Sequence, residues 1–132
     1  MATIVITGAS SGLGAEMARQ FAWLGHTLVL CARRQQNLHA LKDEIEQFHP
    51  GARVHTYVLD VTDPEAVSDT FHQAHAETGG LDRIIINAGI GHGAPIGTGN
   101  PEPNRRTIET NVLGTLAQAE AALEIFRDQA RG

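Results

Sequence analysis

The sequence has 132 residues, enough for one domain with its own core, in which roughly 68% of the unfolded surface could be buried. Hydrophobic residues make up 42% and charged residues 19%, and the net charge of −5 argues against non-specific binding to nucleic acid. No apolar run approaches the ~20 residues that span a bilayer, no signal-peptide pattern is visible, and the single cysteine, Cys31, excludes an intrachain disulfide, so we expect a cytoplasmic protein.

Short β-branched runs alternate with longer amphipathic segments along the chain, a pattern typical of β-α-β domains. Asp63 followed by Pro64 marks a helix start, with Asp63 as the N-cap, and Gly79-Gly80 marks the end of that helix. We predict strands at 2–7, 26–32, 53–59 and 81–87 and helices at 12–24, 35–48, 64–78 and 104–130.

Three of the predicted strands are apolar throughout instead of alternating, as expected of strands that helices cover on both faces. With right-handed crossovers this predicts an α/β fold, the first part of a Rossmann-type doubly wound parallel sheet with strand order 3-2-1-4, as a single domain over residues 1–132. On the first helix we expect an apolar face against the sheet, with Trp23 packing there too: Leu13, Met17, Ala18, Phe21 and Leu24.

A glycine-rich run follows the first predicted strand directly and opens the first helix. Glycines let the backbone approach a pyrophosphate closely, and the helix N-terminus directs free N–H groups and a partial positive charge at it. The run therefore predicts a dinucleotide site that includes Gly8, Ser10, Ser11, Gly12, Leu13 and Gly14.

An arginine pair, Arg33-Arg34, ends the second predicted strand, and no acidic residue follows before Asp43. A cofactor with only ribose hydroxyls favours an acid at this position, whereas a guanidinium suits a 2′-phosphate. We therefore predict NADP(H) as the cofactor. The alternative is that both arginines merely solvate the start of the second helix.

Polar residues also end the third and fourth predicted strands. Asp60 could accept a hydrogen bond from an adenine amino group, or it could cap the next helix, for which Asp63 is better placed. Asn87 could bridge strand backbones and fix the loop beside a ribose, or it could form a simple Asx turn. Gly89 permits close approach of a ligand and also suits a turn.

At these residues the chain resembles the short-chain dehydrogenase/reductase family. The similarity covers essentially all 132 residues and rests on Thr7-Gly8-x-x-x-Gly12-x-Gly14, Asp60-Val61, Asn87-Ala88-Gly89 and Asn111-Val112-x-Gly114. The resemblance implies a Rossmann fold, NADP(H) binding and hydride transfer between nicotinamide and a small-molecule carbonyl or alcohol.

The resemblance also assigns roles by position. The glycine run would surround the pyrophosphate and the adenosine ribose, and Arg33 with Arg34 would take the 2′-phosphate. Asp60 and Val61 would flank the adenine, and Asn87, Ala88 and Gly89 would border the adjoining ribose. Asn111 would be the catalytic asparagine that holds a water in the proton relay, or else an exposed polar residue on a helix.

The sequence departs from the family at the proton donor. The family places a serine and a Tyr-x-x-x-Lys motif after a fifth strand, where Tyr supplies the proton and Lys lowers its pKa. The single tyrosine here, Tyr57, and the single lysine, Lys42, fill neither role. We expect the chain to be the cofactor half of an enzyme, truncated before the fifth strand and inactive alone.

Truncation has a consequence for association. The fourth strand would become an apolar edge, and the last helix would lack part of its cover, so we expect a homo-oligomer or poor solubility. The helix positions concerned are Val112, Leu113, Leu116, Leu123 and Phe126.

Two competing interpretations remain open: a non-catalytic NADPH-binding or redox-sensing module, and an epimerase or dehydratase of the extended branch, which the glycine spacing disfavours. The loop 91–99 is similar to that of reductases acting on 3-oxoacyl chains. We predict no metal site, because His72 and His75 share a helix face without a third ligand. Cys31 is expected to be buried filler.

Overall fold

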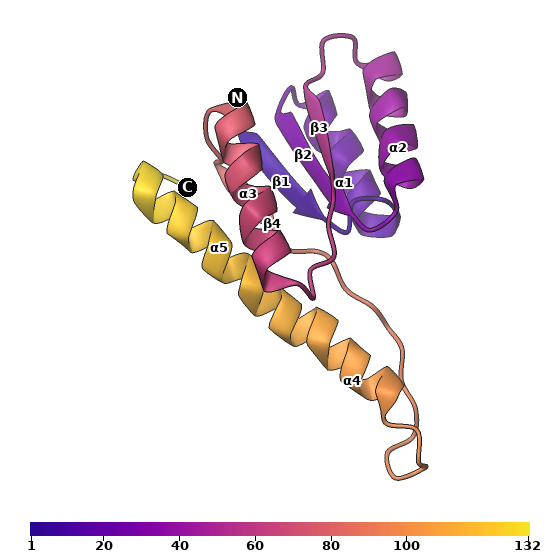
Figure 1. Ribbon diagram of the computed structural model, residues 1–132. Helices are drawn as coiled ribbons and strands as arrows, with labels where there is room; N and C mark the ends of the chain where they lie inside the picture. The colour runs from indigo at the N-terminus through magenta and orange to yellow at the C-terminus, as the bar shows by residue number, and fades with distance from the viewer.

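The computed structural model describes residues 1–132, and the predicted elements form in the predicted order (Figure 1). Asp63 caps its helix as expected, since its carboxylate accepts a hydrogen bond from the backbone N–H of Ala66 at 3.2 Å. The elements are β1 (Thr3–Thr7), α1 (Gly12–Trp23), β2 (Thr27–Ala32), α2 (Gln35–Phe48), β3 (Val54–Val58), α3 (Pro64–Thr78), β4 (Arg83–Ile85), α4 (Glu102–Ile108), the π-helical turn η1 (Glu109–Leu113) and α5 (Gly114–Gln129).

The four strands form one parallel sheet in the order β3-β2-β1-β4, which confirms the predicted topology. Val5 on β1 pairs with Val29 on β2 and with Ile84 on β4. The carboxyl ends of all four strands therefore lie on the same side of the sheet, which is where ligands bind in doubly wound folds.

Helices cover the sheet on both faces, which explains the uniformly apolar strands. Ile4 and Ile6 on β1 pack with α1 and α2, whereas Val5 between them packs with α3 and α5. Phe71 of α3 and Ile125 of α5 belong to this second layer, and both are buried.

The inward face of α1 differs from the prediction. Its buried residues are Gly14, Ala15, Ala18 and Ala22, and Met17 and Phe21 are only partly buried against the same layer. Small side chains let the helix lie close to the sheet and leave no room there for Leu13 and Leu24, which are 77% and 54% exposed. Trp23 was also predicted wrongly: it is 75% exposed and lies edge-on to the ring of His49.

The last helical segment begins at Glu102 and is interrupted by η1, whereas the sequence predicted one helix over 104–130. Wider π-helical turns rotate the residues that follow them relative to an unbroken α-helix. β4 is likewise shorter than predicted, with three residues. It lies at one edge of the sheet, and Val112, Leu113, Leu116 and Leu123 are each more than half exposed, as expected, while Phe126 packs partly against the core.

Candidate functional site

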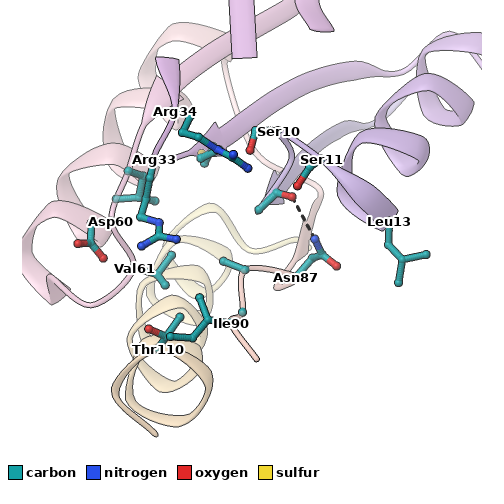
Figure 2. Close-up of a pocket in the computed structure, with 16 residues that line it drawn as sticks. Ser10, Ser11, Leu13, Arg33, Arg34, Asp60, Val61, Asn87, Ile90 and Thr110 are labelled. Atoms are coloured by element: carbon teal, nitrogen blue, oxygen red, sulfur yellow. Dashed lines mark hydrogen bonds between the residues drawn. The ribbon is translucent and has the colours of Figure 1, made fainter. Parts of the chain in front are cut away.

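A cavity of about 310 Å³ lies at the carboxyl ends of the strands, where residues following all four strands meet (Figure 2). Most of the residues singled out in the sequence line it: Gly8, Ser10, Ser11, Leu13, Arg33, Arg34, Asp60, Val61, Asn87, Ala88 and Gly89. Gly12, Gly14 and Asn111 do not line it. The sequence interpretation missed five lining residues. Four directly adjoin a residue that it had singled out, and the fifth, Cys31, had been expected only as buried filler. The five are Cys31, Ala32, Leu59, Ile90 and Thr110.

The turn between β1 and α1 requires glycine at two positions, because a side chain would not fit at either of them. Gly8 has a φ of 63°, and a Cβ there would lie 2.9 Å from the Cα of Ala88. A Cβ on Gly14 would collide with the carbonyl oxygen of Gly8. The turn thus brings the start of α1 against the ends of β1 and β4, and Gly14 serves this packing without lining the cavity.

The N-terminus of α1 opens onto the cavity without a cap. Ser11 is the N-cap residue, but its side chain makes no capping hydrogen bond, and Ser11 and Leu13 both line the cavity. Uncapped N–H groups at the start of a twelve-residue helix offer hydrogen bonds and a partial positive charge to an anion.

Asn87 ties the end of β4 to the glycine turn. Its side-chain amide donates to the carbonyl oxygens of Thr7 at 3.1 Å and Gly8 at 3.3 Å. In the other direction, the buried hydroxyl oxygen of Thr7 accepts from the backbone N–H groups of Asn87 and Ala88, both at 3.1 Å. The strand-bridging interpretation of Asn87 therefore describes its contacts better than a simple Asx turn does.

Arg33, Arg34 and Asp60 form the charged side of the cavity. Asp60 accepts hydrogen bonds from the backbone N–H and the hydroxyl of Thr62, at 3.0 and 2.7 Å, and these bonds, with a smaller contribution from Arg33, lower the pKa of its carboxyl. Neither arginine forms an ion pair with a carboxylate. Figure 2 shows Arg33 on the Asp60 side of the cavity, so two unpaired guanidinium groups are available to an anionic ligand.

Cys31 forms part of the cavity wall and is 1% exposed, so its place as apolar filler is confirmed. Burial raises the pKa of its thiol to about 12. The group is therefore a neutral thiol near neutral pH, which gives the wall apolar character and no nucleophile.

A family model described as short chain dehydrogenase matches residues 2–132. The chain belongs to the short-chain dehydrogenase family. It is 50% identical over 129 residues to an uncharacterized oxidoreductase of Mycobacterium tuberculosis, an alignment that covers 98% of this chain and 51% of the relative.

Solved structures of short-chain dehydrogenases share the fold. An alcohol dehydrogenase from Thermococcus sibiricus, complexed with 5-hydroxy-NADP, superposes with a TM-score of 0.90 at 31% identity, over 99% of this chain and 55% of that one. A metagenomic short-chain oxidoreductase in complex with NADP gives a TM-score of 0.89 at 30% identity, over 99% and 59% of the two chains. The chain spans about half the length of the curated relatives it matches.

Asn111 lies in η1, next to the cavity-lining Thr110. Its side-chain oxygen accepts from the backbone N–H of Ile90 at 2.9 Å, and its amide donates to the carbonyl oxygen of Ile90 at 2.7 Å. Asn111 is exposed, yet its side chain is held against the loop after β4 by these two hydrogen bonds, which leave one N–H and one lone pair of the amide free.

The single tyrosine and the single lysine of the chain lie outside the cavity. The hydroxyl of Tyr57 donates to Glu77 on α3, and burial together with that contact raises the pKa of the phenol. Lys42 lies 3.8 Å from Glu46 on α2. Neither group is placed to deliver a proton into the cavity.

None of the helices in the structure is long and apolar enough to cross a membrane.

Proposed function

We propose that this chain binds NADP(H) as the cofactor half of an oxidoreductase that transfers hydride between nicotinamide and a carbonyl or alcohol. The observation that carries the proposal is the unpaired Arg33-Arg34 pair beside the cavity, at the position where an NAD-binding site favours an acid. The 5-hydroxy-NADP and the NADP in the two related structures described above support the same choice.

The residues present suit the parts of this cofactor. The uncapped start of α1 and the glycine turn suit a pyrophosphate, and the guanidinium groups suit a 2′-phosphate. Asp60 keeps an ionised carboxylate, and one of its two oxygens makes no hydrogen bond within the protein, so it can accept from an adenine amino group. When bound, the nicotinamide would supply the hydride.

Asn111 is proposed to hold a water of the proton relay, as the resemblance to the family implies. The groups that complete such a relay are not among the residues of this cavity, because neither Tyr57 nor Lys42 lines it. Turnover is therefore proposed for a protein that combines these residues with a second, catalytic half. The substrate we favour within the carbonyl class is a 3-oxoacyl chain, and the compartment we favour is the cytoplasm.

Titration of the chain with NADPH and NADH, followed by cofactor fluorescence, tests the proposal. Arg33→Asp removes the favourable charge and adds a repulsive one, so we expect NADPH affinity to fall at least tenfold while NADH affinity changes little or rises. Arg53→Asp is the matched control, because Arg53 is also exposed and unpaired but lies away from the cavity. Equal losses for both cofactors in Arg33→Asp would overturn the proposed NADP preference.

A second candidate is a module that binds NADPH without turning it over. It is favoured by one observation: the cavity is complete in its charged and glycine-rich parts but contains no tyrosine or lysine. The two candidates make different predictions for a protein that joins these residues to a second, catalytic half. We would incubate that protein with NADPH and a panel of ketones, including a 3-oxoacyl thioester. NADPH binding without oxidation favours the module, and NADPH oxidation excludes it.

A further inference from the structure

Three polar side chains on one face of the last helical segment hold the extended segment 90–94 that follows β4. Asn111 bonds to both backbone groups of Ile90, as described above. Thr107 donates to the carbonyl oxygen of His92, with the carbonyl of Pro103 as a second acceptor at 3.0 Å. Asn104 accepts from the N–H of Ala94 at 3.0 Å and donates to its carbonyl oxygen at 2.9 Å.

The spacing of the three side chains along the helix matches the spacing of the backbone groups that they bind. Residues 104, 107 and 111 are three and four positions apart in the sequence, which places them on one helix face about 5 Å apart along the helix axis. Residues 90, 92 and 94 recur at two positions, about 6.6 Å apart in extended backbone, and direct their polar groups to one side. We call these three contacts the side-chain ladder.

The ladder supplies every hydrogen bond that fixes this segment. No backbone-to-backbone hydrogen bond involves any residue from 90 to 94, and the segment belongs to no strand. Gly91 and Gly93, which alternate with the bonded residues, have no side chains to anchor them. The position of the segment therefore depends on Asn104, Thr107 and Asn111.

The segment forms walls of two cavities. Ile90, bonded to Asn111, lines the proposed cofactor cavity together with Gly89 and Thr110. His92 and Gly93 line a second cavity of about 460 Å³, whose other residues are Asn100, Glu102, Pro103 and Arg106. Figure 1 shows the segment running from β4 along the helical segment toward α4, which connects the two places.

We propose that Asn104 and Thr107, which lie outside the cofactor cavity, are positioning residues that fix Ile90 as part of its wall through the side-chain ladder. The proposal rests on the proposed NADP(H) site. Loosening the ladder at Asn104 adds disorder that the cofactor must remove when it binds, so cofactor affinity falls. By linkage, bound cofactor must stabilise the ladder by the same factor.

The test combines Asn104→Ala and Thr107→Val with controls of the same chemistry. Asn37→Ala on α2 and Thr70→Val on α3 remove side chains that make no hydrogen bond and lie away from both cavities. We measure NADPH affinity by fluorescence and amide hydrogen exchange of Ile90 and Ala94 by NMR. Thr107→Val is nearly isosteric, so it keeps the helix packing and checks against misfolding.

Both ladder variants are expected to weaken NADPH binding roughly fivefold and to speed exchange at Ile90, although its own acceptor on Asn111 is intact. NADPH should slow exchange at Ile90 and Ala94 in the unmodified chain. Faster exchange confined to Ala94 in Asn104→Ala, or NADPH affinity equal to that of the controls, would overturn the inference. If the unmodified chain binds no NADPH, the proposed function fails, while the exchange at Ile90 still reports whether the ladder acts as a unit.

Discussion

At the scale of single residues, Gly14 shows how the glycine spacing acts through packing. A Cβ at this position would meet the carbonyl oxygen of Gly8 and would lie 2.8 Å from the side-chain nitrogen of Asn87. Both neighbours are held by the hydrogen bonds that join β4 to the glycine turn, so neither can move away at little cost.

We therefore expect Gly14→Ala to lower the free energy of unfolding by about 2–4 kcal/mol, measured by urea denaturation followed by circular dichroism. Gly91→Ala is the control, because a Cβ there has no neighbour within 4 Å and its φ is not in the left-handed region. A Gly14→Ala chain as stable as the control variant would contradict the close approach of α1 to the turn.

Most residues of the cavity were predictable because parallel strands bring their carboxyl ends to the same side of the sheet, so residues far apart in the sequence could be grouped by topology. Exposure was harder to predict. Leu13 and Trp23 are apolar, yet the stripe that faces the sheet is made of glycine and alanine, because close packing selects small side chains. The spacing of apolar residues in the sequence predicts where large side chains recur, but it does not predict how closely a helix packs on the sheet.

At the scale of elements, Asp82 joins the starts of β1 and β4 to the end of the chain. Its carboxylate accepts from the backbone N–H of Thr3 at 2.8 Å and from the guanidinium of Arg131 at 3.0 Å. The hydrogen bond from Thr3, and then that from Arg131, hold the pKa of this carboxyl below its ordinary value of 3.8. A lowered pKa means that the ionised form stabilises the fold.

The contribution of Asp82 is therefore complete above the unfolded pKa and is lost as the pH falls through the lowered, folded pKa. We expect Asp82→Asn to unfold at a lower urea concentration than the unmodified chain at pH 7, with the difference shrinking as the pH is lowered below about 4. Asp69→Asn is the control, since Asp69 is exposed on α3 and makes no hydrogen bond. A difference between Asp82→Asn and the unmodified chain that is independent of pH would contradict this account.

The helical segment after β4 marks the limit of prediction at this scale. Its existence follows from the apolar pattern, but the π-helical turn does not, because one widened turn barely alters the sequence periodicity. The side-chain ladder could not be predicted from the sequence either. Asn104 and Thr107 have no distinctive neighbours in the sequence, and their role depends on the loop lying beside the helix.

At the scale of the whole molecule, the apolar surface is unevenly distributed. The sheet is covered on both faces, but β4 lies at its edge, and the α4 end of the helical segment projects beyond the sheet (Figure 1). Leu113, Leu116 and Leu123 are 56%, 55% and 59% exposed, and their spacing places them on one helix face. An exposed apolar stripe on a helix, in a molecule that also has an edge strand, favours association.

We expect the chain to self-associate through this stripe. The double variant Leu116→Glu/Leu123→Glu should shift the chain toward monomer, because association would then bury two charges from each copy in the contact. Light scattering coupled to size exclusion measures the mass of both. Leu24→Glu is the control, since Leu24 is equally exposed, at 54%, but lies at the end of α1. An unmodified chain that is monomeric at high concentration would contradict the prediction, and equal dissociation by Leu24→Glu would place the contact elsewhere.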